Sequence, residues 1–219
     1  VADEWFNGLP HLRIWDLTTG ESHFIAFDEP AYALFPDENY DFSTDVFRFA
    51  YSSMLTPKTV YDYDMKTRTK TLKKQTEILG GYDPSQYQME RIFARASDGV
   101  MIPITIMYKK GMIRDGKAPL WLYAYGAYGI NTEPYFSANQ FSLLDRGMIY
   151  AEANIRGGSE MGRQWYYDGK LAKKRNSFTD FIASAEHLIG AKYTSSDRLV
   201  ISGGSAGGLL IGAVVTMRP

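Results

Sequence analysis

The stretch RLVISGGSAGGLLIGAVVTM, residues 198–217, decides the fold of the second half of this chain. It reads as a short apolar strand at 198–202, the turn Gly203-Gly204-Ser205-Ala206-Gly207-Gly208, and an apolar helix from 209 onward. A serine at a strand-to-helix turn adopts a strained backbone that excludes bulky neighbours, and glycines on both sides provide the space. The stretch therefore predicts a sharp turn that holds the hydroxyl of Ser205 at the carboxyl end of a β-sheet.

Ser205 in this setting has the position of a catalytic nucleophile. The turn would aim the N–H of Ala206, at the start of the helix, at the oxygen of a substrate carbonyl, where negative charge develops during attack. A flexible loop and a phosphate cradle are the alternatives. A dinucleotide-binding loop has Gly-x-Gly-x-x-Gly and a P-loop has Gly-Lys-Ser/Thr, and the turn matches neither. The pattern favours acyl transfer through Ser205 on an α/β-hydrolase fold.

A serine nucleophile needs a general base, usually a histidine that a carboxylate orients. The chain has three histidines, His11, His23 and His187, and all of them precede Ser205. In α/β-hydrolases the order along the chain is serine, then acid, then histidine, so none of the three is expected to be the base. We expect the acid and the histidine in sequence after Pro219. A catalytically incomplete fragment or a binding module stays open as the alternative.

Strands and helices alternate in the residues before the serine turn. Residues 119–125 and 148–154 are apolar enough to be strands buried on both faces, and a helix is expected between them at 137–146. An amphipathic helix follows, with Ser177 and Asp180 as candidates for its N-terminal cap and Gly190 as its stop. Its apolar positions recur at helical spacing: Phe178, Phe181, Ile182, Ala185, Leu188 and Ile189. The alternation predicts a mostly parallel sheet with helices on both faces.

The hairpin signal Ser97-Asp98-Gly99, flanked by apolar residues, opens this second unit with an antiparallel pair of strands. Upstream, the sequence reads as short strands separated by turns. Trp15-Asp16-Leu17 and Tyr63-Asp64-Met65 share a pattern at the spacing of one propeller blade of about 40 to 50 residues. Two copies leave a plain antiparallel sheet equally open. Because Gly80-Gly81 and Asp83-Pro84 interrupt the strand pattern, we predict one domain at 1–78 and a second at 79–219.

Composition restricts the partners of the chain. With 45% hydrophobic residues, 22% charged residues and a net charge of −1 over 219 residues, it is typical of a globular protein without a basic stripe, so no nucleic acid and no membrane partner is expected. The absence of cysteine excludes a thiol nucleophile, disulfides and Cys-based zinc sites. No cofactor or metal is expected, and a short peptide fits as the substrate. The compartment stays open, with the cytoplasm favoured.

Three stretches together give the chain a family resemblance: Asn154-Ile155-Arg156-Gly157-Gly158-Ser159-Glu160, residues 165–176, and residues 203–219. Over nearly its whole length the sequence resembles the prolyl oligopeptidase family, and within that family the oligopeptidase B group. Members join a seven-bladed β-propeller to an α/β-hydrolase domain. The resemblance implies that residues 1–78 are the last blades of a propeller and that 79–219 are the first part of the catalytic domain.

The resemblance also implies roles for residues outside the serine turn. In the family a tyrosine hydroxyl in a Tyr-Gly-x-aromatic motif is the second oxyanion donor, and Tyr125-Gly126-Ala127-Tyr128 is similar to that motif, so Tyr125 would be the donor and Tyr128 would line the substrate pocket. Glu133 stands where the family carries acids for the residue that precedes the cleaved one, and Tyr135 stands where some members have a second acid. From the residues alone, a strand-end tyrosine such as Tyr125 is more often a core residue, and Glu133 reads equally as an exposed loop residue.

The function that the resemblance implies is hydrolysis of short peptides after Arg or Lys, through an acyl-enzyme on Ser205. Carboxylates suit such substrates because they pair with guanidinium and ammonium groups once water is excluded. The propeller would restrict access by size. A prolyl-specific oligopeptidase or an esterase of the same fold is the alternative enzyme.

Overall fold

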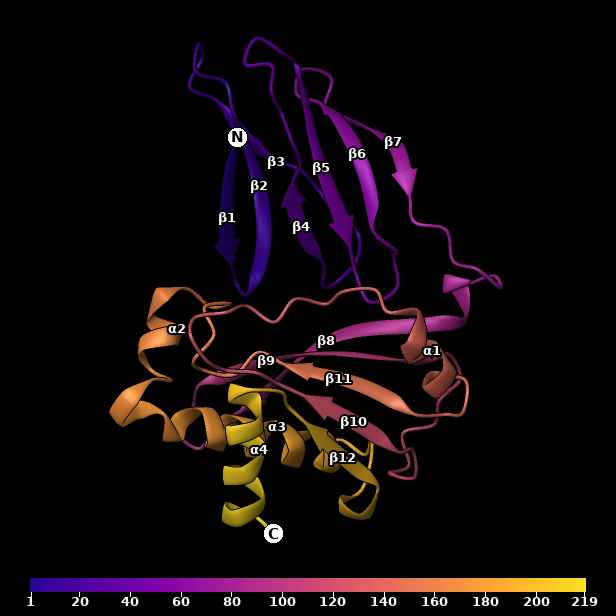
Figure 1. Cartoon of the computed structure of the whole chain (residues 1–219), viewed down its shortest axis with the longest axis vertical. Helices are drawn as coiled ribbons and strands as arrows, with labels where there is room; N and C mark the ends of the chain where they lie inside the picture. The colour runs from indigo at the N-terminus through magenta and orange to yellow at the C-terminus, as the bar shows by residue number, and fades with distance from the viewer.

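The computed structural model describes all residues from Val1 to Pro219, and their strands form three β-sheets (Figure 1). Two small antiparallel sheets stand side by side in the first part of the chain, and the third and largest sheet lies across their lower ends. The first small sheet has the order β1-β2-β3, with β1 at Ala2–Phe6, β2 at Leu9–Trp15 and β3 at Ser22–Phe24. The second has the order β4-β5-β6-β7, with β4 at Ala33–Pro36, β5 at Val46–Ser52, β6 at Thr59–Asp64 and β7 at Thr69–Gln75.

The repeated pattern around Asp16 and Asp64 is explained by one type of turn. The Asp16 carboxylate accepts hydrogen bonds from the N–H groups of Thr18 and Thr19, at 2.8 and 3.2 Å. The Asp64 carboxylate accepts from the N–H groups of the residues two and three positions further on, at 2.9 and 2.7 Å. Each turn closes four residues after the aspartate on a residue with positive φ, Gly20 or Arg68. The shared pattern therefore marks equivalent hairpins in two successive sheets.

The third sheet contains five strands in the order β12-β10-β11-β9-β8. The strands are β8 at Tyr87–Arg95, β9 at Met101–Lys109, β10 at Leu120–Tyr123, β11 at Ile149–Ala153 and β12 at Leu199–Ser202. β10 pairs in parallel with both β11 and β12, whereas β9 pairs antiparallel with β8 and β11. The predicted hairpin thus forms the antiparallel side of the sheet. The parallel strands β10 and β12 end together, because Tyr123 is in register with Ser202.

Helices cover both faces of this sheet. They are α1 at Ala138–Leu144, α2 at Arg163–Tyr167, α3 at Arg175–Gly190 and α4 at Ala206–Met217, with single 3₁₀ turns η1 at Pro84–Gln86, η2 at Leu171–Lys173 and η3 at Ser196–Arg198. α3 and α4 pack on the face away from the small sheets, and α1 lies on the other face (Figure 1). No helix combines the length and the apolar character that crossing a membrane requires.

The predicted N-terminal cap of α3 is wrong. The helix begins at Arg175 with Lys174 as its N-cap, so Ser177 and Asp180 lie inside it. Both side chains are fully buried and bind another segment: Ser177 Oγ donates to the Arg156 carbonyl at 2.5 Å, and Asp180 accepts from the Arg156 guanidinium. The side-chain oxygens that would cap the helix are hydrogen-bonded instead to Arg156, which is distant in sequence.

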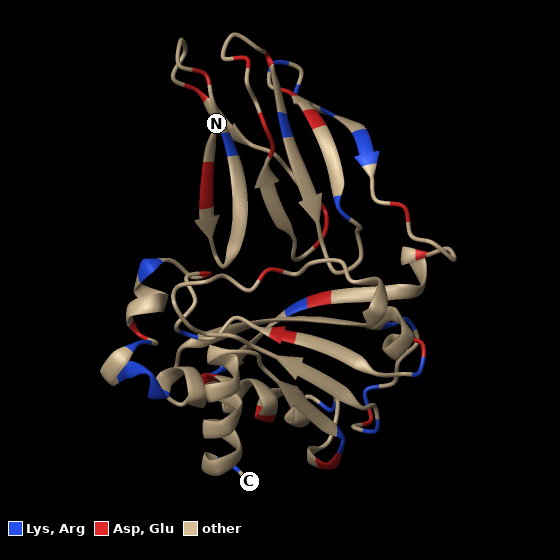
Figure 2. Cartoon of the chain, viewed as in Figure 1, with Lys and Arg blue, Asp and Glu red and all other residues tan.

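The main core lies between the third sheet and its two packed helices. It is formed by apolar side chains that include Ile102, Ile104, Ile106, Leu120, Leu122, Phe181, Leu188 and Leu210. Figure 2 shows that β9, β10 and β12 carry hardly any charge. This is expected for β9, which is almost wholly buried, whereas β12 lies at the edge of the sheet and leaves Val200 half-exposed. The exception is the buried Glu152 on β11, which accepts a hydrogen bond from the Tyr150 hydroxyl at 2.7 Å. Burial raises the pKa of Glu152 to about 7.

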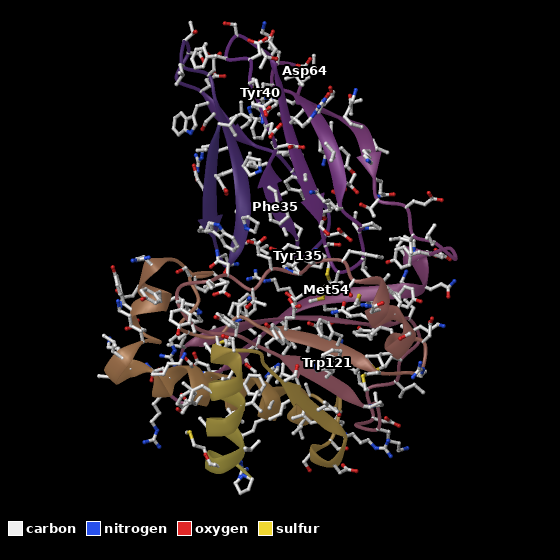
Figure 3. All side chains as sticks on the ribbon, viewed as in Figure 1. Phe35, Tyr40, Met54, Asp64, Trp121 and Tyr135 are labelled. Atoms are coloured by element: carbon white, nitrogen blue, oxygen red, sulfur yellow. The ribbon has the colours of Figure 1, made fainter.

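The two parts of the chain meet through apolar and aromatic contacts. A second buried cluster joins Met54 and Ala31, from the first part, to side chains of the third sheet and α1. Tyr135 stacks on Phe35 with ring centroids 5.7 Å apart. Figure 3 labels both residues, near the junction of the two parts. The N–H of Phe136 donates to Ser52 Oγ at 3.3 Å. The segment 131–137, which leads from the end of β10 toward α1, therefore contacts both parts of the chain.

Candidate active site

Ser205 occupies a strained turn between β12 and α4. Its backbone has φ +55° and ψ −117°, a conformation that a residue with a side chain rarely adopts. A Cβ atom on Gly203 would lie 2.5 Å from the Gly207 carbonyl oxygen, and one on Gly207 would lie 3.0 Å from the Ala124 carbonyl oxygen. Gly204 has open space on its Cβ side. The close packing thus requires glycine at 203 and leaves little room for a Cβ atom at 207, whereas the expectation from sequence treated all the flanking glycines alike.

The Ser205 side chain is exposed and makes no capping hydrogen bond with α4. The three histidines lie elsewhere in the fold. His23 is hydrogen-bonded to the Tyr63 hydroxyl at 2.8 Å, His11 packs edge-on against a phenylalanine ring of the first sheet, and His187 lies in the last turn of α3. None of them forms a hydrogen bond with Ser205, in agreement with the chain-order argument against them as the base.

Tyr125 lies next to the serine turn. It follows β10 by two residues, and β10 and β12 end side by side. Its Cα and ring Cδ2 atoms are each 3.7 Å from the position that a Cβ atom on Gly207 would occupy. The tyrosine is therefore in contact with the first turn of α4, whose first N–H group belongs to Ala206. The two residues predicted from sequence as oxyanion donors, Tyr125 and Ala206, thus follow adjacent strands of the sheet, β10 and β12.

The loop after Tyr125 is pressed against the segment that follows β11. Gly126 has φ +62°, and a Cβ atom there would lie 2.5 Å from Ile155 Cδ1. The N–H of Gly129 donates to the Gly157 carbonyl at 2.9 Å. Tyr128, between these contacts, has φ +58° and is 74% exposed. Its ring is available to a ligand, and it is held there by a backbone conformation that is costly for a tyrosine.

Glu133 is partly buried in segment 131–137, and so it differs from the exposed loop residue that was the alternative prediction. Its Oε2 atom is buried and has no hydrogen-bond partner. Burial raises the pKa of the Glu133 carboxyl to about 7. Burial, and then the neighbouring Glu133 carboxylate, raise the pKa of Tyr135 to about 12, so that side chain is an uncharged hydroxyl at neutral pH.

Two residues that sequence reasoning gave no role hold the Glu133 segment in place. Glu160 Oε1 accepts the Thr132 N–H at 2.8 Å, and Asn154 Nδ2 donates to the Thr132 carbonyl at 2.8 Å. Asn154 also donates to Glu160 Oε1 at 3.3 Å. Both backbone polar atoms of the residue before Glu133 are thus fixed by side chains. Burial of Glu160 raises its pKa to about 7.

Arg156, in the same motif, ties the third sheet to α3. Its Nε and Nη2 atoms donate to the two carboxylate oxygens of Asp180 at 2.8 and 2.5 Å, and its Nη1 donates to Asp98 at 2.6 Å. The hydrogen bond from Arg156 lowers the pKa of Asp98, which lies in the β8–β9 turn. Arginine is well suited to bidentate pairing with a carboxylate. Because Asp98 and Asp180 lie far from Arg156 in sequence, the sequence did not predict which carboxylates it binds.

No group of three or more His, Asp or Glu side chains lies close enough together to hold a metal ion. The chemistry that the described residues support is addition of a serine hydroxyl to a carbonyl. A strained serine between a parallel strand and a helix is typical of the class of α/β-hydrolases.

Comparison with known proteins narrows this class. Residues 1–76 match the model for the N-terminal β-propeller domain of prolyl oligopeptidase, and residues 134–219 match the model for the prolyl oligopeptidase family. The chain belongs to the prolyl oligopeptidase family. It combines the β-propeller with the α/β-hydrolase fold of that family.

Individual relatives agree with that assignment. The chain is 48% identical to dipeptidyl aminopeptidase BI of Pseudoxanthomonas mexicana over 100% of its own length and 30% of that protein. It is 45% identical to protease 2 of Moraxella lacunata over 96% of its length. The structure of oligopeptidase B from Leishmania major superposes with a TM-score of 0.90 at 39% identity, covering 99% of this chain and 32% of that one. The chain therefore spans about 30% of the length of the curated relatives it matches.

Proposed function

We propose that this chain carries the nucleophile and the oxyanion donors of a serine oligopeptidase that hydrolyses short peptides. The observation that supports the proposal best is the strained, exposed Ser205 at the start of α4, with Tyr125 in contact with the same helical turn. The names of the relatives, an aminopeptidase and a protease among them, agree with peptide substrates. We refer below to the longer polypeptide that would contain these 219 residues as the full-length enzyme.

In the proposed reaction, Ser205 Oγ attacks the peptide carbonyl while a histidine accepts its proton. The carbonyl oxygen becomes an oxyanion, to which the Ala206 N–H and the Tyr125 hydroxyl donate hydrogen bonds. The histidine returns the proton to the leaving amine, which leaves an acyl-enzyme on Ser205. Water then hydrolyses the ester by the same steps. The histidine and its orienting acid are proposed to lie in sequence after Pro219.

We further propose that the enzyme cleaves the peptide bond after an Arg or Lys residue. Glu133 would bind the side chain of the residue immediately before that Arg or Lys. Its buried Oε2 has no partner within the chain, and a guanidinium or ammonium group would supply one. Tyr128 would line the pocket beside it. Tyr135 has a hydroxyl at the position where some members of the family have a second acid. Glu133 would therefore be the single carboxylate that selects a basic residue at this subsite.

Chromogenic peptides that differ only in the residue before the chromophore test this specificity. The full-length enzyme is expected to hydrolyse the Arg peptide with a higher kcat/KM than the Pro peptide. Relatives named prolyl endopeptidase, such as that of Elizabethkingia meningoseptica at 40% identity, make the Pro peptide the relevant comparison. Equal kcat/KM values for the two peptides would contradict cleavage after basic residues while leaving the serine chemistry intact.

Replacing Glu133 with glutamine is expected to remove the preference for a basic residue at the position before the cleaved one. A hydrogen bond to a charged group contributes about 1.5 to 3 kcal/mol, so kcat/KM for a peptide with Arg at that position should fall about 10- to 100-fold. A peptide with Ala there should be affected less than about twofold, because it makes no ion pair. Glu38→Gln, on an exposed loop of the first part, is the matched control.

The same preference is expected to depend on pH. Because burial raises the pKa of Glu133 to about 7, the side chain is uncharged below that pH and carboxylate above it. The ratio of kcat/KM for the Arg and Ala peptides should therefore rise as pH increases from 6 to 8, whereas Glu133→Gln should give a flat ratio. A ratio that rises equally in the variant would assign the pH dependence to another group.

A further inference from the structure

The ammonium group of Lys174 is partly buried without a counter-charge. Its Nζ atom donates to the Gly126 carbonyl at 2.5 Å and to Ser177 Oγ at 3.2 Å, and both acceptors are neutral. Among the ion pairs of the chain, the neighbouring Lys173 has one with Asp168 at 2.6 Å, but Lys174 has none. Burial lowers the pKa of Lys174, and no carboxylate opposes that effect. Withdrawing a charge from water without an opposite partner is costly, so this placement needs a reason.

Stabilisation of α3 does not provide that reason. Lys174 is the N-cap of α3, and the first turn of the helix contains no acidic residue. The N-terminus of a helix carries partial positive charge, so a cation there is unfavourable. Figure 2 shows further basic residues along the segment between α2 and α3. Within α3 the Lys174 ammonium contacts only uncharged groups, the Ser177 hydroxyl and the Phe178 ring, whose centroid lies 5.9 Å away.

The Gly126 carbonyl depends on Lys174 for its hydrogen bond. Ser177 Oγ lies 3.5 Å from that oxygen, but it has one proton and is only 2.5 Å from the Arg156 carbonyl, which takes it. Ser177 is thus an acceptor for Lys174 and a donor to Arg156. A Cβ atom on Gly157 would lie 2.7 Å from the carbonyl carbon of Gly126, so the loop is closely packed on that side as well.

Gly126 is the residue directly after Tyr125. It has a positive φ, and its carbonyl lies in the peptide plane between Gly126 and Ala127, the second plane after the tyrosine. A hydroxyl donor acts on an oxyanion only when its oxygen is held within hydrogen-bond range of the place where charge develops. A misplacement of about 1 Å can lower a rate about 100-fold.

We propose that Lys174 is a positioning residue for the oxyanion hole, which holds the Gly126 carbonyl so that the Tyr125 hydroxyl faces the substrate carbonyl at the Ser205 turn. The inference rests on the proposed function, since it acts through Tyr125. It predicts an effect on the chemical step and not on peptide binding, because Lys174 bonds to the Gly126 carbonyl and Ser177 and has no hydrogen bond or ion pair with Tyr128 or Glu133.

The test is the Lys174→Met variant of the full-length enzyme, which keeps the length of the side chain and removes its donors. We expect kcat, expressed per site titrated with a fluorophosphonate, to fall about 10- to 100-fold while KM changes less than about twofold. Titration removes any contribution from unfolded protein. Lys173→Met, which removes the adjacent exposed lysine, is the control and should stay within about twofold of the unmodified enzyme.

A double-mutant cycle with Tyr125→Phe separates positioning from a general structural effect. If Lys174 acts through Tyr125, adding Lys174→Met to Tyr125→Phe lowers kcat no further. Independent, multiplying losses would overturn the inference, and so would a kcat for Lys174→Met equal to that of Lys173→Met. An unchanged kcat for Tyr125→Phe alone would instead refute the oxyanion role within the proposed function, and the inference with it.

Discussion

Replacing Ser205 with alanine is expected to lower kcat of the full-length enzyme by about 10⁵- to 10⁶-fold, the loss seen when a catalytic serine is removed. The residual rate would come from substrate binding and the oxyanion donors alone. Because the Ser205 side chain makes no capping bond with α4, the variant should unfold at nearly the same temperature as the unmodified enzyme. Hydrolysis of a chromogenic peptide measures the first expectation, and calorimetry the second.

Fluorophosphonate labelling provides an independent check on Ser205. The full-length enzyme should be modified at this residue, and Ser205→Ala should not be modified. Ser43→Ala, on an exposed loop of the first part, should label normally. Labelling of Ser205→Ala at the rate of the unmodified enzyme would place the nucleophile elsewhere, and the strained turn would then need another explanation.

Replacing Tyr125 with phenylalanine is expected to lower kcat by about 10²- to 10³-fold, the usual cost of one oxyanion donor. KM should change little, because the hydroxyl interacts with charge that exists only as the bond forms. Tyr128→Phe is the matched control: it removes a hydroxyl from the same loop, and a ring that only lines a pocket should keep kcat within about threefold. Steady-state kinetics on one peptide compares the two variants, and equal losses would show that Tyr125 has no special role.

Much of the fold could be predicted because its signals are local. The serine turn is encoded by small residues directly beside Ser205, and the two hairpins with Asp16 and Asp64 by side chains that bind their own turns. The strand and helix periods of the second part identified its strands and three of its helices in order, but α2 was not predicted and α4 begins at Ala206 and not at 209. Local signals specify elements and turns well because both partners of each interaction lie within a few residues.

The contacts that hold the candidate site in place could not be predicted, because they join segments that are distant in sequence. Asn154 and Glu160 bind Thr132 across 22 and 28 residues, and Lys174 binds Gly126 across 48. No period or turn motif links these positions. The wrong cap of α3 has the same cause, since Ser177 is used by a carbonyl 21 residues earlier in the chain. Tertiary contacts override local preference wherever a buried polar atom finds a distant partner.

The segment that carries Glu133 is fastened at both ends to different bodies. Before Glu133 in the sequence, the backbone of Thr132 is hydrogen-bonded to Asn154 and Glu160 of the hydrolase part. After Glu133, Tyr135 and Phe136 contact the propeller part. A motion that separates the propeller part from the hydrolase part would have to break the contacts on one side of Glu133. The position of the Glu133 carboxylate therefore depends on contacts with both parts of the chain, all made within the seven residues 131–137.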